Sequence, residues 1–247
     1  MKVIKSVFVI SISLLSSFLP LSIFKPSLPV EFLTKAYAQD AQSYLNSAQN
    51  YLNKGDLENA TLNINKILKM NAEYPLNMLS FMMLGVIEDK KESYSEAIKY
   101  YTKSINIILQ KEDRSSLGGL YGLRAKSKKD NKDFSGAIKD YTLAIENDGV
   151  IPGSGWLFER AYSKMGINDH KGAIDDFTDL IDLDPNKKSN ATVYILRGYN
   201  KFLMNDLKGN CLDLKKAEDL GGVTIDNRNI LKEEKKKYKC SLYEIDD

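Results

Sequence analysis

The residues of this chain with the clearest capacity for chemistry are arginines and aspartates that recur at one fixed spacing. Three arginines are each followed sixteen residues later by an aspartate, in the pairs Arg124 and Asp140, Arg160 and Asp176, and Arg197 and Asp213. Such carboxylates could serve catalysis or ligand binding, but three regular copies suit a repeated structural element better than one active site. We therefore predict that each pair joins two helices of one hairpin, since a partly buried arginine and carboxylate can form a two-point ion pair.

Histidine and cysteine, the side chains used in much acid–base and metal chemistry, are scarce. The 247 residues include two cysteines and one histidine, His170, whose position in a turn favours a packing role. One histidine excludes most acid–base and metal schemes that need two. The sequence also lacks a Gly-x-Ser-x-Gly motif, a phosphate loop and a dinucleotide fingerprint. We therefore expect no enzyme, no catalytic residue, no cofactor and no bound metal.

The elements that position these side chains are short paired helices. The stretch from Arg160 to Pro185 predicts two helices joined by a turn at 166–169. The second helix places apolar residues on one face at helical spacing, namely Ala173, Ile174, Phe177, Leu180 and Ile181. Pro185 ends this helix, because proline cannot continue one. A hairpin this short cannot bury both of its faces alone, so we expect it to be repeated.

The same pattern recurs five times in one register. A small residue of the first helix recurs as Ala48, Gly85, Ala125, Ala161 and Gly198. Twelve residues later come Ala60, Ala97, Ala137, Ala173 and Asn210, and sixteen residues later come Ile64, Tyr101, Tyr141, Phe177 and Leu214. Five matching copies predict a solenoid of stacked helical hairpins.

On these positions the chain resembles the tetratricopeptide repeat (TPR) family, over about residues 40–221. The resemblance implies an all-α fold, a right-handed superhelical solenoid of about five hairpins plus a C-terminal capping helix. The repeats are expected at about 41–74, 78–111, 118–151, 154–187 and 191–222, within a solenoid domain at 39–221. The first, third and fifth copies depart from the family pattern by lacking the closing proline, and Asn210 stands where alanine is usual.

The end of the chain looks like the closing copy and capping helix of a bacterial, exported TPR type, with the cap and tail at 222–247. Cys211 lies on the last second helix and Cys240 near the end of the cap. In an oxidising compartment these cysteines could form a disulfide that locks the cap, worth about 3 kcal/mol in the chain-entropy model. Two free thiols remain the alternative, because spacing alone does not fix the distance between them.

Residues 1–38 read as a secretory signal peptide. Lys2 and Lys5 precede an apolar run at 7–24, and Ala36-Tyr37-Ala38 offers a cleavage site. Removal would take away four lysines and one glutamate and change the formal net charge from +2 to −1. We therefore expect export to a periplasm, an equivalent lumen or the medium, and no attraction for nucleic acid. The alternative is an uncleaved membrane anchor at 7–24, the only route by which we expect membrane contact.

The resemblance implies that the first helix of each hairpin lines a concave groove that binds a protein or peptide partner. The partner-binding positions expected there are Gln49, Lys126, Lys129, Phe158, Tyr162, Ile195, Tyr199 and Phe202. Aromatic anchors of this kind are candidate hot spots for recognition. The alternative is that some of the aromatic residues pack against the next repeat. The inward positions do not reproduce the carboxylate clamp of chaperone-binding TPR modules.

These observations predict a non-enzymatic interaction scaffold, and family analogy suggests a role in assembling an envelope or membrane complex. There are two alternative functions. One is an organiser that keeps its N-terminal membrane helix, and the other is an accessory subunit of an enzyme. An intact N-terminus would favour the first, and turnover that depends on a groove residue would favour the second.

Overall fold

The computed structural model describes residues 35–70, 72, 74–112, 114, 116–148, 155–221, 236–237 and 240. This described part of the chain is helical and contains no strand. The predicted all-α fold of TPR hairpins is therefore confirmed for it. Most of the predicted signal peptide, and the predicted cap apart from residues 236–237 and 240, lie outside the described residues.

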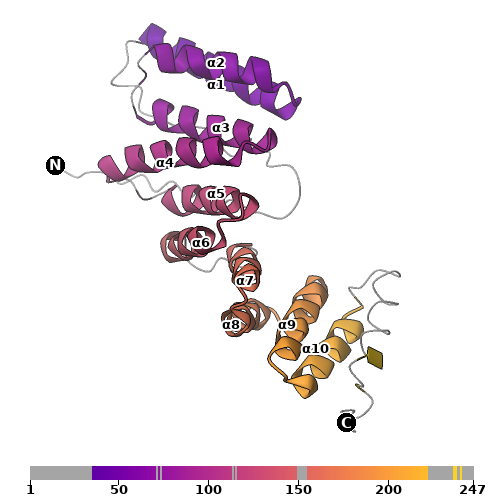
Figure 1. The fold of residues 1–247 in the computed structure, drawn as a ribbon. Coiled ribbons are helices and arrows are strands. Elements are labelled where there is room, and N and C mark those ends of the chain that lie inside the picture. The colour runs from indigo at the N-terminus through magenta and orange to yellow at the C-terminus, as the bar shows by residue number, and fades with distance from the viewer. Residues whose placement is uncertain are drawn as a thin grey trace, which may run out of the picture. The chain divides into compact units, whose positions relative to one another are not determined.

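The chain divides into two compact units, which meet in sequence between Ser154 and Gly155. Unit 1 contains three hairpins: α1 (Lys35–Asn53) with α2 (Leu57–Lys69), α3 (Leu76–Lys90) with α4 (Tyr94–Gln110), and α5 (Leu117–Asp130) with α6 (Phe134–Asp148). Figure 1 shows these hairpins stacked in chain order. Within unit 1, α2 and α4 each pack on their own first helix and on the first helix of the next hairpin, and α6 packs on α5.

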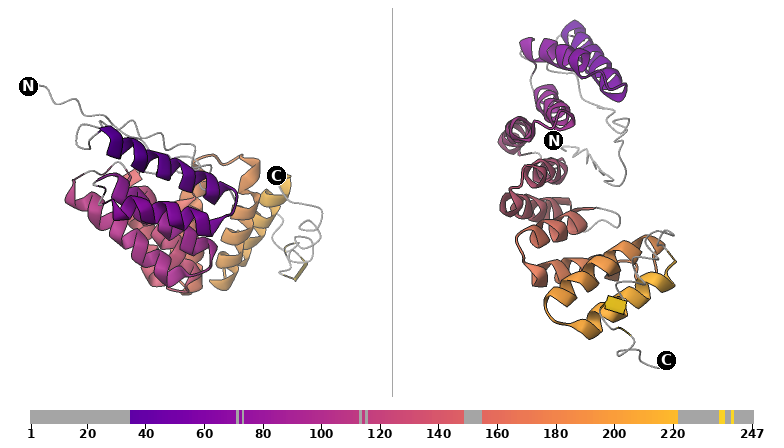
Figure 2. Two further views of the ribbon diagram at one scale, coloured as in Figure 1. Left: turned by 90° about the horizontal axis from the view of Figure 1, so that it is seen from above. Right: turned by 45° about the vertical axis from the view of Figure 1, so that its right-hand side comes forward.

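Unit 2 contains two hairpins: α7 (Trp156–Gly166) with α8 (His170–Asp182), and α9 (Ala191–Leu203) with α10 (Leu207–Asp219). A short 3₁₀ helix, η2 (Lys188–Asn190), precedes α9. The helices pack in sequence, α7 on α8, α8 on α9 and α9 on α10 (Figure 2). Unit 2 therefore repeats the hairpin architecture of unit 1.

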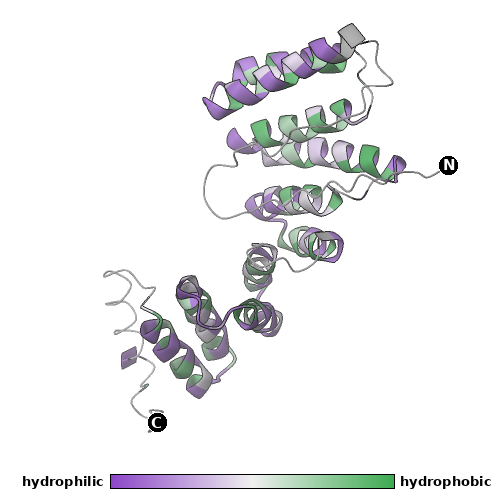
Figure 3. Ribbon diagram, turned by 180° about the vertical axis from the view of Figure 1, so that it is seen from behind, coloured by the Kyte–Doolittle hydropathy of each residue, from purple (hydrophilic) through white to green (hydrophobic). Residues whose placement is uncertain are grey.

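The repeating positions explain the packing inside each hairpin. The alanines at the two small positions are completely buried, as with Ala48 and Ala60, so the two helices approach closely there. The large residue lies beneath them and is also buried, as with Phe177. A Cβ added at Gly85 would lie 2.5 Å from the Tyr101 ring, so glycine leaves room for this ring in the second hairpin. Hydrophobic and hydrophilic residues accordingly alternate along the helices (Figure 3).

The turns between paired helices share one backbone conformation. The residue seven positions after the small residue has a positive φ in all five hairpins: Gly55 (78°), Glu92 (60°), Lys132 (66°), Asn168 (60°) and Asn205 (65°). Only the first of these is glycine, the residue for which this left-handed conformation costs least. The tight turn is therefore held by the packing of the hairpin and not by the residue type.

An aspartate caps the second helix of several hairpins. Asp56, Asp169 and Asp206 each precede a second helix and accept a hydrogen bond from the backbone N–H three residues later. In the last two cases that residue is glycine, and the aspartate carboxylate lies in the space that a Cβ would take. Capping of this kind satisfies a helix N–H that has no partner within the helix.

Candidate functional site

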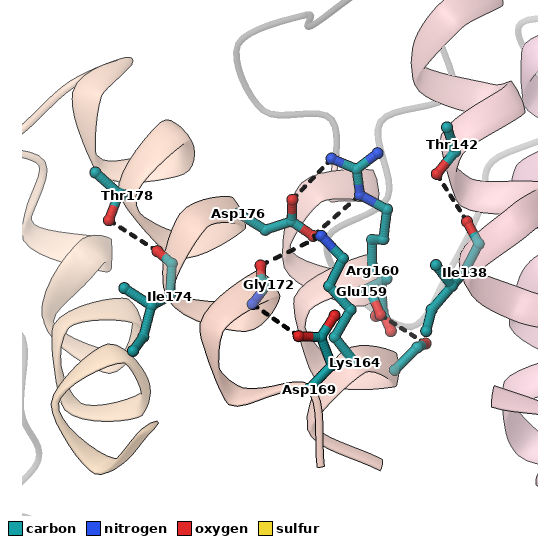
Figure 4. Close-up of polar contacts among 11 residues, drawn as sticks. Ile138, Thr142, Glu159, Arg160, Lys164, Asp169, Gly172, Ile174, Asp176 and Thr178 are labelled. Atoms are coloured by element: carbon teal, nitrogen blue, oxygen red, sulfur yellow. Dashed lines mark hydrogen bonds and ion pairs between the residues drawn. The ribbon is translucent and has the colours of Figure 1, made fainter. Parts of the chain in front are cut away.

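The structure brings together each arginine and aspartate that recur sixteen residues apart. In all three pairs, Nε and Nη2 of the arginine donate to the two carboxylate oxygens of the aspartate over 2.7–3.0 Å. The aspartate side chains are only 3–4% exposed. Figure 4 shows this geometry for Arg160 of α7 and Asp176 of α8. Each pair joins the two helices of its hairpin.

A lysine completes each of these pairs, which the sequence analysis missed. Lys128, Lys164 and Lys201 lie four residues after the arginine and place Nζ 2.8–2.9 Å from the same carboxylate. The signal was an Arg-x-x-x-Lys pattern that only these three copies carry. Each buried carboxylate therefore holds two cations of its own hairpin.

Two of the arginines also contact the preceding hairpin. Nη1 of Arg124 donates to Oγ1 of Thr102 in α4, and Nη1 of Arg197 donates to Oγ1 of Thr178 in α8, each over 3.1 Å. The arginine thus fixes the position of its hairpin against its neighbour. These contacts give the two arginine side chains a structural role.

The second hairpin has no arginine or aspartate at the positions of the ion pair and instead has an aromatic contact between its helices. Leu84 and Tyr100 occupy the arginine and aspartate positions. The Tyr100 ring stacks on Phe81 with ring centroids 6.3 Å apart, and Nζ of Lys103 lies over both rings. Aromatic stacking therefore joins α3 and α4 where an ion pair joins the helices of the third, fourth and fifth hairpins.

A partly buried carboxylate connects three helices of unit 1. Oδ2 of Asp89 in α3 accepts a hydrogen bond from the Tyr101 hydroxyl in α4 (2.8 Å), and Oδ1 accepts one from Ser127 in α5 (2.6 Å). Burial raises the pKa of Asp89, although these two hydrogen bonds and Lys126 act in the opposite direction. Burial and the neighbouring Asp89 raise the pKa of the Tyr101 phenol well above its usual value.

The predicted groove positions of unit 1 are occupied by polar residues that bond within their own helices. Nε2 of Gln49 donates to Asn53 over 3.2 Å on α1. Nζ of Lys126 lies 2.9 Å from Asp130 on α5, and Nζ of Lys129 lies 3.8 Å from the same carboxylate. Asp130 therefore offsets part of the positive charge of Lys126 and Lys129.

The predicted aromatic and aliphatic positions of unit 2 fall into two groups. Phe158 packs edge-on against Phe177 with centroids 5.9 Å apart, and Ile195 and Phe202 pack against the core of unit 2. Tyr162 on α7 and Tyr199 on α9 are instead 48% and 43% exposed. The two tyrosines occupy the same position in successive hairpins, directly after the small residue.

Further apolar residues accompany these tyrosines. Ile167 directly follows α7 and Met204 directly follows α9, again at equivalent positions, and Leu203 ends α9. Each is 42–50% exposed. We call Tyr162, Ile167, Tyr199, Leu203 and Met204 together the α7/α9 face. The sequence analysis missed the three aliphatic members, although comparison of the copies could have revealed them, because unit 1 has Lys, Lys and Asn where unit 2 has Ile167 and Met204.

Two further contacts hold the hairpins of unit 2. Nδ1 of His170 lies 2.9 Å from Oδ1 of Asn200 and so links α8 to α9. Because Nδ2 of Asn200 donates to the Leu196 carbonyl, its Oδ1 is the acceptor and His170 is the donor. Cys211 on α10 and Cys240 form a disulfide with Cα atoms 5.3 Å apart, and both side chains are buried.

The described residues contain neither a metal-binding cluster nor a membrane-spanning helix. No group of three or more His, Cys, Asp or Glu side chains there is arranged to hold a metal ion. No helix of the described part is long and apolar enough to cross a membrane. The apolar run at 7–24 lies outside that part.

Comparison with known proteins identifies the repeat. The family model described as "Tetratricopeptide repeat" matches residues 41–74 and 80–110, the first two hairpins. The chain contains tetratricopeptide repeats. No curated protein matches it by sequence. Its TPR hairpins continue beyond the matched residues, since all five copies share one register and one backbone turn.

Solved structures share this TPR fold at low sequence identity. A crystal structure of MamA protein matches with a TM-score of 0.63 and 18% identity, covering 85% of this chain and 98% of that one. MamA residues 41-end from Desulfovibrio magneticus RS-1 gives a TM-score of 0.62 and 14% identity, covering 74% and 95%. YrrB, described as a TPR protein with an unusual peptide-binding site, gives 0.63 and 16%, covering 82% and 98%.

The TPR repeats support one class of function. TPR solenoids are in general non-enzymatic scaffolds for protein–protein interaction, and they present surfaces built from successive repeats. This TPR chain is accordingly a protein-interaction scaffold, and its ion pairs, caps and disulfide serve the framework. The members of the α7/α9 face are large apolar side chains that stay 42–50% exposed.

Proposed function

We propose that this TPR protein binds a protein or peptide partner through the α7/α9 face. The observation that carries the proposal is the pair Tyr162 and Tyr199, exposed at the same position of successive first helices. Large apolar side chains that remain exposed together on a soluble surface mark interaction sites. Tyrosine is enriched among the residues that dominate binding energy, because its ring offers a large contact at low entropic cost.

The test is cross-linked capture from the native envelope with wild-type protein and the Tyr162→Ala/Tyr199→Ala variant. The matched control is Leu62→Ala/Leu109→Ala, which removes two equally exposed apolar side chains from second helices of unit 1. The proposal predicts a partner captured by the wild type and the control and lost by the tyrosine variant. Equal capture by all three proteins would place the binding surface elsewhere.

We also propose that the protein works after export, with residues 1–38 removed, in the assembly or maintenance of an envelope or membrane complex. The basic start, apolar run and Ala36-Tyr37-Ala38 site support removal. The Cys211–Cys240 disulfide suits an oxidising compartment. N-terminal sequencing of protein purified from its native cell tests this proposal. A first residue at Gln39 supports export with cleavage, whereas an intact N-terminus would favour the membrane-anchored alternative.

A further inference from the structure

We infer that the Cys211–Cys240 disulfide is a redox-controlled closure of the last hairpin, which gains its full stability only in an oxidising compartment. The chain at Cys240 covers the face of α10 that, in earlier hairpins, contacts the next hairpin. The inference concerns the stability of α9 and α10 and is tested on the purified chain without a partner. It therefore does not depend on binding at the α7/α9 face.

Two hydrogen bonds identify the face of a second helix that contacts the next hairpin. Thr102 of α4 accepts one from Arg124 of α5. Thr178 of α8 accepts one from Arg197 of α9. Both threonines lie seventeen residues after the small residue of their hairpin. The residue thirteen after the small residue lies one helical turn earlier and so on the same face. In the first four hairpins it is half-buried and is Thr61, Ile98, Ile138 or Ile174.

The last second helix, α10, has different residues at both of these positions. Cys211 occupies the first and Lys215 the second. A lysine only donates hydrogen bonds, so Lys215 could not accept one from the arginine of a further hairpin. No hairpin follows α10 among the described residues, yet Cys211 is only 5% exposed. This face of α10 is therefore suited to the disulfide and not to another repeat.

Cys240 belongs to the buried core of unit 2. It is 4% exposed and lies in the same cluster as Leu214 and Ala217 of α10. Its bond to Cys211 joins residues that are 29 positions apart in the sequence. Closing a loop of this length removes conformational freedom from the unfolded chain. Reduction returns that freedom, and in the chain-entropy model it raises the unfolding equilibrium constant by about a hundredfold.

Closing the bond is a two-electron oxidation by thiol–disulfide exchange. One cysteine thiolate attacks a disulfide-bonded oxidant and forms a mixed disulfide, and the other thiolate then displaces the oxidant as a thiolate. The two thiols lose two protons and two electrons, and the oxidant disulfide becomes a dithiol. Because both cysteines are buried once joined, an external thiolate reaches the bond only when the hairpin opens. The closure should therefore persist after it has formed.

The experiment compares hydrogen–deuterium exchange of the whole chain in two redox states. One sample is oxidised, and the other is unfolded in urea with dithiothreitol and refolded with the reductant present. We expect the amides of α9 and α10 to exchange at least about tenfold faster in the reduced chain, because local opening controls their exchange. The amides of α3 and α4 in unit 1 should not change. Cys211→Ala/Cys240→Ala should exchange like the reduced wild type, with or without reductant.

Maleimide labelling under native conditions gives a second readout that does not rely on the alanine variant. We expect both thiols of the reduced chain to be labelled, because the cover over α10 opens without the bond. Thiols that stay protected would overturn the inference. Equal exchange of α9 and α10 in the two redox states would also overturn it, as would equal acceleration of α3 and α4. Complete exchange of α9 and α10 with α3 and α4 still protected would support it.

Discussion

Arg197 of α9 and Asp213 of α10 form a two-point ion pair, with Nε–Oδ2 and Nη2–Oδ1 distances of 3.0 Å and 2.7 Å. Nη1 of the same guanidinium reaches Thr178 of the preceding hairpin. One arginine thus holds the two helices of its own hairpin and the neighbouring hairpin together. The equivalent pairs Arg124–Asp140 and Arg160–Asp176 have the same two-point geometry. The same ion pair therefore joins the two helices in the third, fourth and fifth hairpins.

Removing the arginine of one such pair should destabilise the fold. In Arg160→Ala, Asp176 keeps only Lys164 and remains almost fully buried. We expect a loss of about 2–4 kcal/mol in the free energy of unfolding, near the cost of breaking a buried pair. Urea denaturation measures the change, and Lys171→Ala, at an exposed position on the same hairpin, is the control with little expected effect. Unchanged stability would show that the pair is not a structural contact.

Replacing Asn210 should stabilise unit 2. Neither polar atom of its side chain has a hydrogen-bond partner, and the residue is 1% exposed. The other four copies have alanine at this position. We expect Asn210→Ala to raise the free energy of unfolding by about 1 kcal/mol, because an unpaired buried amide is costly. A decrease in stability would mean that the packing of the amide outweighs its missing hydrogen bonds.

Asn210 should also be coupled to the residue that faces it. A Cβ added at Gly198 would lie 3.0 Å from Oδ1 of Asn210. Gly198→Ala alone should therefore reduce stability, and it should cost less in a protein that already carries Asn210→Ala. A double-mutant cycle on thermal or urea unfolding measures this coupling. Additive effects would indicate that the two residues do not constrain each other.

Glycine should improve the turns that now hold other residues at positive φ. Glu92 and Lys132 have φ values of 60° and 66°. Because non-glycine residues pay about 1–2 kcal/mol in this conformation, Glu92→Gly and Lys132→Gly should each stabilise by up to about 1 kcal/mol. Lys91→Gly, at the adjacent residue with a φ of −89°, should destabilise slightly. Equal effects of glycine at 91 and 92 would contradict this explanation.

Asp89 should make stability depend on pH in a defined direction. Burial raises its pKa in the folded chain above the ordinary value of 3.8, so the folded state binds the proton more tightly than the unfolded state. The resulting stabilisation is complete below 3.8 and is lost as the pH rises through the folded pKa. Asp89→Asn lacks this titration. The unfolding free energy of the wild type minus that of the variant should therefore fall as the pH rises, and a constant difference would contradict the assignment.

The sequence predicted the helical hairpins and their ion pairs better than the exposed residues that could bind a partner. Small residues such as Ala161 and Ala173 must recur wherever two helices approach closely, so their spacing reveals the fold. Lys164 was missed because its role depends on which way a long side chain turns. The groove residues illustrate the same limit, since Phe158 and Tyr162 are four residues apart and only the structure shows that the first packs inward and the second stays exposed.

The most direct test of the account is site-specific photo-cross-linking in the native envelope, with a photoreactive phenylalanine analogue in place of Tyr199. The same analogue in place of Leu109 of unit 1, which is 45% exposed, serves as the control. The account predicts a discrete cross-linked protein product from position 199 and none from position 109. No product at 199, or the same product at both positions, would contradict the claim that the α7/α9 face is the partner-binding surface.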